Sequence, residues 1–366
     1  MRMQAYTDRV GVDRSPRGPG PVYRVPVTIE VLPPAARDRG VDLARAVAVV
    51  SMLIAHLAPG GPVAVPLQAT EWLTAALFAM LAGVGAELSW RASDARTRPL
   101  PHVAGALVRA ALVIGLGVLL DLPDHQVVIV LVPLGIAMAI LAALTRLPSG
   151  ALAALVIALA VATPALTRAH GATLTSLGSP GWWYELLVVG HPYRVASMVL
   201  WGLVGALAVR ALRSRRRPML EIGGASVLVA SAATLAVLSH VNRIDASPYS
   251  GTYAETALTT CLALAVLLVC RACAPVIPAV VLARLDAVGA MTLTLYAVQI
   301  AAMVWYLSTL PPGSLDDSWP FLAGLLVLAF VLPTLWRTAV PTGPFARGPL
   351  EGVVDTAVRA TRHALR

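Results

Sequence analysis

The sequence predicts an all-α, polytopic integral membrane protein, and three observations carry this prediction. Apolar residues make up 58% of the 366-residue chain and charged residues only 13%, which is more apolar than ordinary soluble domains. The apolar residues gather into ten segments long enough to cross a bilayer, for which ~20 residues suffice. Every basic residue is an arginine, and most arginines fall between these segments, as expected where positive charge sets membrane orientation.

The ten predicted spans form a helical bundle with short polar connections. They cover residues 43–58, 71–90, 101–120, 126–145, 149–167, 195–212, 220–240, 255–272, 288–309 and 321–337. The fourth and fifth are joined by the tight hairpin RLPSG. The segment VIPAVVLARLD, between the eighth and ninth spans, is too short to cross and is expected at the inner interface.

The arginine positions predict that both termini face the cytosol. A cytosolic N-terminus leaves only Arg168, Arg194 and Arg243 on the outer side, in agreement with the excess of basic residues in cytoplasmic loops. An even number of spans follows from this orientation.

The chain divides into a membrane domain and two tails. Residues 1–40 contain many Pro, Gly and Arg residues and no apolar core of a signal peptide, so we expect a disordered cytosolic tail. The transmembrane domain is expected over 41–340. The cytosolic tail 341–366 separates charged from apolar residues on helical faces, which predicts an amphipathic helix that either lies on the membrane or packs on the bundle.

Composition argues against two kinds of partner. The net charge is +9, but no basic module interleaved with aromatic residues occurs, so we expect no nucleic acid. Cys261, Cys270 and Cys273 lie in or at the end of one apolar run, and the CxxC spacing of CRAC has no second pair to complete a metal site. These thiols are expected to be structural, and no metal is predicted.

A polar stripe marks the first predicted helix, VDLARAVAVVSMLIAH. Arg45 and His56 are eleven positions apart, so they share one helical face at a separation of ~16 Å along the axis. Asp42 precedes Arg45 by one turn. An arginine at mid-depth costs ~3 kcal/mol on insertion scales, and intramembrane ionisable groups therefore tend to face internal cavities and to have functional roles. We predict a conduit with an anion-attracting cytosolic mouth and a deeper imidazole suited to proton transfer; separately, each residue could instead be an ordinary interfacial residue.

The same stretch resembles a known family. DLARAVAVVSMLIAH, with Arg45 and His56, resembles the first membrane helix of the acyltransferase-3 family. The ordered segments GVDLARAVAVVSMLIAHLAP, ALFAMLAGVGAEL, GAMTLTLYAVQI and RGPLE resemble more closely bacterial relatives of heparan-α-glucosaminide N-acetyltransferase and YeiB-like membrane proteins. These families belong to one transmembrane acyltransferase superfamily, and the resemblance spans roughly residues 38–352.

The resemblance implies a function in the plasma membrane of a bacterium. Such proteins move an acyl group, usually acetyl, from cytosolic acyl-CoA to a hydroxyl or amine of an envelope glycan or glycolipid on the far side. His56 would be catalytic, and Arg45 would be its partner near the entrance for the coenzyme. Membrane lipids are the other expected partners, and the many small residues permit a homo-oligomer without setting one.

Further candidates supplement this pair. Arg91, Arg96, Arg98 and Arg109 could hold the nucleotide and pyrophosphate of the coenzyme, although the same arginines also serve topology. Glu87, near the inner end of the second span, is expected to pair with Arg45 or Arg91.

Four residues are candidates for substrate binding. Tyr296 and Gln299 lie one turn apart and could line the conduit or hydrogen-bond between helices. His191 and Arg194 could hold the acceptor or a lipid phosphate at the outer side, or cap the interface.

Two other functions remain open at the level of sequence. The polar stripe could serve a non-enzymatic transporter or flippase of an envelope lipid or glycan, whose mark would be two corresponding halves with broken helices. Related proteins commonly carry histidine at the position of Gln299 and arginine at the position of Leu73, so the chain could also be a degenerate member that acts as an assembly partner.

Overall fold

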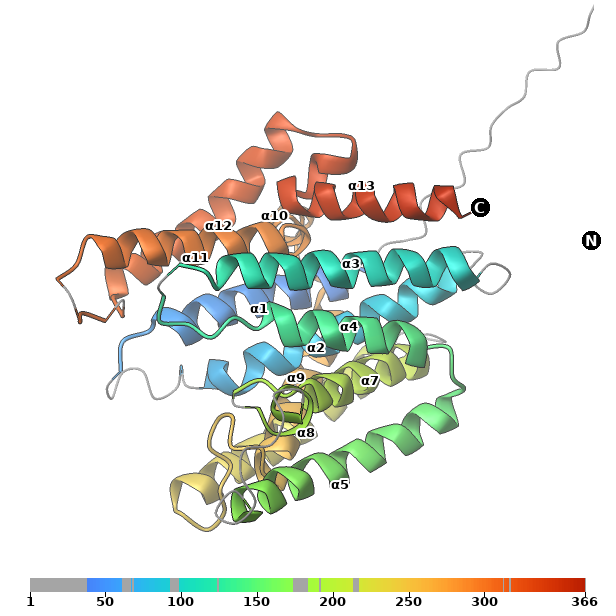
Figure 1. Ribbon diagram of the computed structural model, residues 1–366, viewed down its shortest axis with the longest axis vertical. Coiled ribbons are helices and arrows are strands. Elements are labelled where there is room, and N and C mark those ends of the chain that lie inside the picture. The colour runs from blue at the N-terminus through green and yellow to red at the C-terminus, as the bar shows by residue number, and fades with distance from the viewer. Residues whose placement is uncertain are drawn as a thin grey trace, which may run out of the picture. The chain divides into compact units, whose positions relative to one another are not determined.

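The computed structural model describes residues 38–60, 67, 69–92, 99–123, 125–173, 184–190, 192–212, 217–311, 313–315 and 317–365. All regular elements in these residues are helices (Figure 1), which confirms the predicted all-α class. The elements are α1 (Arg39–Leu57), α2 (Ala69–Ala92), α3 (Pro99–Leu120), α4 (Leu131–Leu144), α5 (Ser149–Thr173), the π-helix η3 (Glu185–Val189), α7 (Val195–Leu212), α8 (Pro218–His240), α9 (Tyr253–Cys273), α10 (Ala279–Ala290), α11 (Thr292–Ser308), α12 (Trp319–Ala339), the 3₁₀-helix η4 (Pro344–Arg347) and α13 (Pro349–Ala364).

Eight described helices are long and apolar enough to cross a membrane, namely α1, α2, α3, α5, α7, α8, α9 and α12. The predicted ninth span, residues 288–309, corresponds to α11 and the last three residues of α10, and the two helices are bent by 68° at their junction. The rest of α10 lies largely in the separately predicted segment VIPAVVLARLD. The predicted fourth span contains α4, whose 14 residues extend about 21 Å and fall short of the ~30 Å hydrocarbon core. The count of ten spans is therefore not confirmed, and the cytosolic placement of both termini stays a prediction.

The start of α1 is fixed by a local cap. The Asp38 carboxylate accepts a hydrogen bond from Gly40 N at 3.0 Å, which satisfies one of the amide groups left open in a first helical turn. Of the predicted N-terminal tail, residues 38–40 thus form the cap and beginning of α1, and residues 1–37 lie outside the described part. We refer to the two ends of the bundle as the Arg45 end, where α1 begins, and the His56 end, where α1 finishes.

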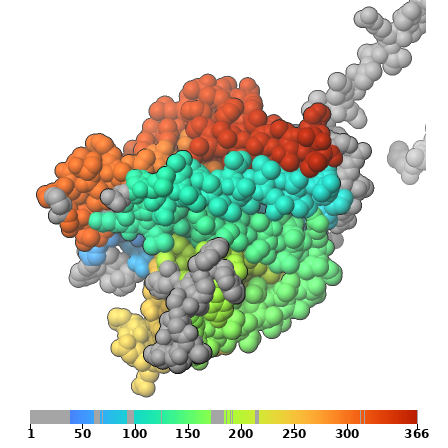
Figure 2. Space-filling view, in the orientation of Figure 1, coloured from blue at the N-terminus to red at the C-terminus, as the bar shows by residue number. Residues whose placement is uncertain are grey.

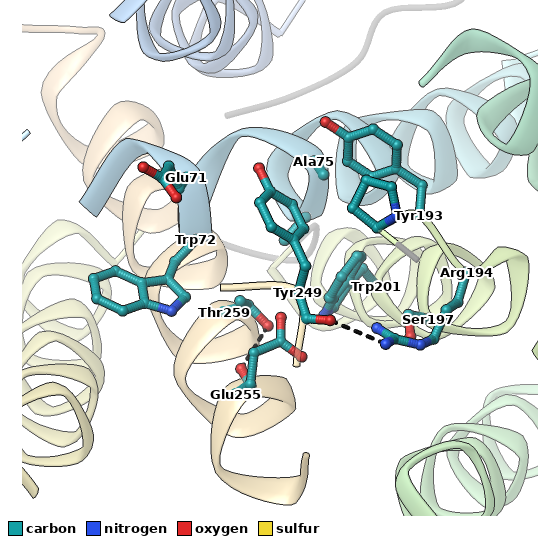
Figure 3. Close-up of a pocket in the computed structure, with 12 residues that line it drawn as sticks. Glu71, Trp72, Ala75, Tyr193, Arg194, Ser197, Trp201, Tyr249, Glu255 and Thr259 are labelled. Atoms are coloured by element: carbon teal, nitrogen blue, oxygen red, sulfur yellow. Dashed lines mark hydrogen bonds between the residues drawn. The ribbon is translucent and has the colours of Figure 1, made fainter. Parts of the chain in front are cut away.

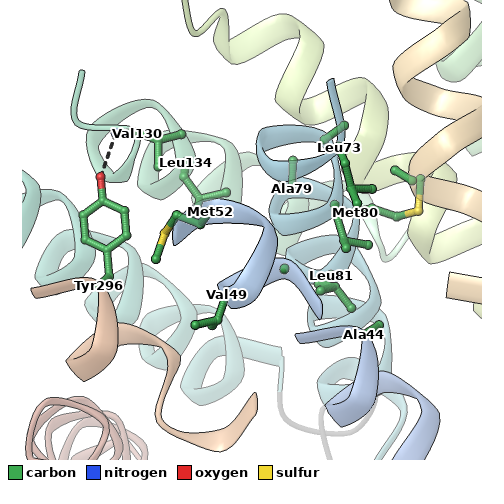
Figure 4. Packing of buried hydrophobic residues seen from close by; sticks show 14 of the residues in the cluster. Ala44, Val49, Met52, Leu73, Ala79, Met80, Leu81, Val130, Leu134 and Tyr296 are labelled. Atoms are coloured by element: carbon green, nitrogen blue, oxygen red, sulfur yellow. Dashed lines mark hydrogen bonds between the residues drawn. The ribbon is translucent and has the colours of Figure 1, made fainter. Parts of the chain in front are cut away.

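The core of the bundle surrounds α1 and α2. Helix α1 packs against α2, α9, α10 and α12, and helix α2 packs against α7. Figure 4 shows Val49 and Met52 of α1 in this buried cluster, together with Met80 of α2 and Tyr296 of α11. A Cβ atom on Gly83 would lie 1.8 Å from the carbonyl oxygen of Gly202. This glycine therefore permits the close approach of α2 and α7 that small residues provide in membrane bundles.

The outer helices expose apolar side chains. Only 22%, 17%, 11% and 22% of the apolar windows of α3, α5, α8 and α12 are buried. Examples of exposed residues are Leu119, Ile157, Val227 and Leu335. Apolar surface on this scale is unfavourable in water and suits contact with lipid tails, so the chain is a multi-pass membrane protein.

The C-terminal helix α13 packs along α3. Figure 2 shows α13 seated on α3 on one face of the molecule. Val354 and Val358 of α13 are buried, and Arg109 Nη2 donates to Asp355 Oδ1 at 2.9 Å. Of the two roles predicted for the amphipathic tail, the structure therefore favours packing on the bundle.

Candidate active site

His56 and Gln299 form a direct contact between α1 and α11. His56 lies in the last turn of α1, and Gln299 Nε2 is 2.7 Å from His56 Nδ1. Gln299 is 1% exposed. His56 Nε2 has no hydrogen-bond partner among the described residues and is not an enclosed atom. The imidazole is thus held at one nitrogen and open to a reactant at the other.

The amide of Gln299 can set the tautomer of His56. Half a turn of a carboxamide exchanges its oxygen and nitrogen at one position, so Gln299 can donate to Nδ1 or accept from Nδ1–H. When Oε1 accepts from Nδ1–H, the ring lone pair lies on Nε2. That nitrogen is the open one, so this tautomer is the form that a general base needs.

Arg45 and Asp42 form an ion pair at the opposite end of α1. Arg45 Nη1 donates to Asp42 Oδ1 at 2.8 Å, and the two side chains are 34% and 1% exposed. The junction of α10 and α11 packs closely against this end of α1. A Cβ atom on Gly289, near the end of α10, would lie 2.2 Å from the Asp42 carbonyl oxygen. Arg45 therefore reaches solvent while its partner is buried.

The α1 face between these two levels is packed, which corrects the expectation of an open conduit. Val49, Met52 and Leu53 are 0%, 1% and 3% exposed. A small cavity lies on this face, and Gln299 is its polar lining residue. Its other lining residues are Val49, Leu53, Leu295, Val298, Leu325, Leu328 and Ala329. Apolar side chains of α1, α11 and α12 thus occupy the expected passage.

Tyr296 serves a contact between helices. It is 3% exposed, and its hydroxyl accepts from Val130 N at 3.4 Å, as the dashed line in Figure 4 shows. Val130 precedes α4, so this hydrogen bond ties α11 to the start of α4. Of the two predicted roles for Tyr296, its contacts fit the one between helices.

The arginines predicted to hold the coenzyme are ion-paired where the structure describes them. Arg91 Nε donates to the carboxylate of Glu87, as predicted for this glutamate, and Glu87 is fully buried. Arg210 Nη2 donates to the other Glu87 oxygen at 2.8 Å. Arg109 is paired with Asp355 as described above. Their charges are already compensated, and this makes them weaker candidates for a coenzyme.

Three further predicted site residues cannot be placed. Arg96, Arg98 and His191 lie outside the described residues. The sequence did not indicate a structural role for Arg210. An arginine at the end of a predicted span is interpreted first as a determinant of membrane orientation. Arg210 also donates to Thr145 O at 2.6 Å, so it joins the ends of α2, α4 and α7.

The RGPLE segment binds the start of α11. Glu351 accepts hydrogen bonds from Leu293 N at 2.7 Å, Thr294 N at 3.0 Å and Thr294 Oγ1 at 2.6 Å. Burial raises the pKa of Glu351, and these hydrogen bonds partly offset the increase. Two segments of the resemblance that lie about 50 residues apart in sequence therefore meet at the break between α10 and α11.

A second cavity lies at the His56 end, between α2, α7 and α9 (Figure 3). Arg194 lines it and donates from Nη2 to Tyr249 O at 3.0 Å. Burial lowers the pKa of Arg194, and the charge of Glu255 partly offsets this. The sequence did not single out Glu71, Tyr249 or Glu255 as companions of Arg194, since they come from three separate segments. Arg194 thus lines the same cavity as Glu71, Tyr249 and Glu255.

These features define a class of protein: a multi-pass helical membrane protein with a polar pair at each end of its first span. Within the described residues, no group of three or more His, Cys, Asp and Glu side chains could hold a metal ion. No curated protein and no solved structure matches the chain. The model of the heparan-alpha-glucosaminide N-acetyltransferase catalytic family matches residues 37–221, and the chain belongs to this family of membrane acetyltransferases.

Proposed function

We propose that this protein transfers an acyl group, most simply acetyl, from cytosolic acyl-CoA to a hydroxyl or amine of an envelope glycan or glycolipid in a bacterial plasma membrane. The observation that carries the proposal is the contact between His56 and Gln299, because it leaves the second imidazole nitrogen open. The donor would approach from the Arg45 end and the acceptor from the His56 end.

In this proposal, His56 carries one proton from the acceptor to the leaving group. Its Nε2 takes the proton of the acceptor as the acceptor oxygen or nitrogen attacks the thioester carbonyl carbon. The carbon–sulfur bond breaks, and the imidazolium returns the proton to the leaving thiolate. General-base catalysis of this kind contributes on the order of 10²- to 10⁴-fold to a rate. Gln299 would keep Nδ1–H bound throughout, so the ring does not rotate between the two transfers.

The test uses the protein reconstituted in vesicles with radiolabelled acetyl-CoA and an envelope lipid and glycan fraction. His56→Ala should abolish transfer while insertion and thermal unfolding stay as in the wild type. The matched control is His240→Ala, which removes an exposed imidazole at the end of α8 and should leave transfer intact. Normal transfer by His56→Ala would remove the mechanism.

A transporter is the second candidate, and the bend between α10 and α11 favours it, because broken helices form the substrate sites of many transporters. The N-terminus of α11 is, however, occupied by Glu351, which fills the place where such a site would bind an anion. Movement of labelled glycolipid across vesicles without acetyl-CoA, unchanged in His56→Ala, would favour the transporter.

A further inference from the structure

An apolar cavity lies beside the contact between His56 and Gln299. Three helices line it: Val49 and Leu53 come from α1, Leu295, Val298 and Gln299 from α11, and Leu325, Leu328 and Ala329 from α12. We call it the Gln299 cavity. Because it adjoins the residue that holds the proposed general base, its size and polarity bear on which acyl groups can react.

The Gln299 cavity lies on the Arg45 side of His56. Leu53 and Val49 precede His56 on α1 by three and seven residues, so they lie about 4.5 and 10.5 Å from it along the helix axis. Helix α11 also starts at the Arg45 end, where its junction with α10 packs against α1. A donor that approaches from the Arg45 end therefore meets the cavity just before it reaches His56.

The cavity suits a small apolar group better than a water molecule. It leaves about 10 Å³ for the centres of water-sized spheres, which is room for roughly one water molecule. Seven of its eight lining residues are apolar, whereas a buried water needs about two to four polar partners. A methyl group is similar in size to a water molecule, needs no hydrogen bond and gains dispersion contacts with apolar side chains.

The lining residues of α12 form one face of that helix. Leu325, Leu328 and Ala329 are spaced at i, i+3 and i+4, so they lie on the same side. Leu325 and Ala329 are 6% and 3% exposed, whereas Leu335, further along the same helix, is 59% exposed. The α12 face at the cavity therefore points into the bundle, and other residues of this helix are left for contact with lipid.

We propose that the Gln299 cavity receives the alkyl part of the acyl group and that Leu325, Leu328 and Ala329 set the length of the chain that fits. This rests on the proposed function. With the carbonyl carbon beside His56, the methyl of an acetyl group fills the cavity. A propionyl group adds one methylene, for which the closed cavity has no space. One methylene in an apolar pocket discriminates between substrates by about 10- to 200-fold.

The family match does not assign this role. It covers residues 37–221 and ends before α11 and α12 begin. The residues that would select the acyl chain therefore lie in the part of the chain that the match does not cover.

The test compares acetyl-CoA with propionyl-CoA in the reconstituted vesicles, with one envelope fraction as acceptor for both. The readout is the ratio of the two kcat/KM values, which should favour acetyl by about 10- to 200-fold in the wild type. Leu325→Ala enlarges the cavity and should lower this preference about tenfold or more. Leu328→Ala makes the same change at a partly buried position and keeps the test available if Leu325→Ala does not fold.

Leu335→Ala is the matched control, because it makes the same substitution at an exposed position of the same helix. It should keep the wild-type ratio. Ala329→Val tests the opposite change: its two added methyl groups occupy the cavity and should lower acetyl transfer about tenfold or more. A role in packing alone would change the rates with both donors by the same factor, so it would leave the ratio unaltered in Leu325→Ala and Leu328→Ala.

The results separate failure of this proposal from failure of the proposed function. Equal kcat/KM values for the two donors in the wild type would overturn the acyl pocket while leaving acyl transfer in place. An unchanged ratio in both Leu325→Ala and Leu328→Ala would do the same. Transfer of neither acyl group by the wild type would refute the proposed function itself.

Discussion

Replacing Gln299 with leucine tests the site at the atom that orients His56. The substitution keeps a similar volume at a position that is 1% exposed, but it removes the 2.7 Å contact to Nδ1. A buried hydrogen bond contributes about 0.5–1.5 kcal/mol net, and an unsatisfied group left behind costs about 1–3 kcal/mol. A loss of about 1–3 kcal/mol in the transition state corresponds to a roughly 5- to 150-fold slower reaction.

The loss of activity in Gln299→Leu should appear as a lower kcat, with KM for acetyl-CoA little changed. Gln299 acts through His56, and its hydrogen bond becomes stronger as the ring takes up the proton, so the interaction differs between ground and transition states. The assay is acetyl transfer at varied acetyl-CoA concentration, with the thermal unfolding midpoint as a fold control. Gln299→Glu keeps an acceptor for Nδ1–H and should retain far more activity than Gln299→Leu.

Three results would refute this reasoning. Equal rates for wild type and Gln299→Leu would show that the contact does not orient a catalytic base. A change confined to KM, with kcat unchanged, would assign Gln299 to substrate binding, as the sequence first suggested. Equal losses in Gln299→Leu and Gln299→Glu would point to a packing role.

Stability offers four more tests, each read as thermal unfolding in detergent. Arg210→Ala leaves a buried Glu87 oxygen without its partner and should destabilise by about 3–5 kcal/mol. Arg109→Ala breaks an exposed pair and should cost less than about 1 kcal/mol. Glu351→Ala uncaps the first turn of α11 and should cost about 1–2 kcal/mol. Because burial raises the pKa of Glu351, its linked contribution to stability decreases as pH rises from the unfolded towards the folded pKa, and Glu351→Gln should lack this decrease.

The sequence predicted the helical class well because hydrophobic length is a direct physical requirement of a bilayer. The sequence separated a short segment before the ninth span, and this segment contains most of α10, but the predicted span began at residue 288, in the last turn of α10. Apolar length does not reveal the 68° bend between α10 and α11, where Glu351, from a distant segment, accepts hydrogen bonds from the first turn of α11. The fourth span was overcounted for a related reason, since apolar loop residues before Leu131 lengthened the run.

The candidate site was partly predictable. Helical spacing places Arg45 and Asp42 together, and the 2.8 Å pair follows from that local geometry. The contact between His56 and Gln299 was not predicted, because it joins residues 243 positions apart. The pairing of Arg91 with Glu87 was predicted, but that of Arg109 with Asp355 was not, because these two residues are 246 positions apart.

The packed α1 face determines what must move if an acyl group is to pass from the Arg45 end to His56. The cavity beside Gln299 leaves about 10 Å³ for the centres of water-sized spheres, which is room for roughly one water molecule, so the surrounding helices must separate. The two helices that line the cavity, α1 and α12, are buried to different extents. In the apolar stretch of α1, 67% of the residues are buried, against only 22% in that of α12. Displacing α12 breaks fewer packing contacts, so α12 and not α1 should open the passage. A passage that opened instead between α1 and α2 would have to disrupt the hydrogen bond of 2.7 Å between Ser51 and Thr74 as well.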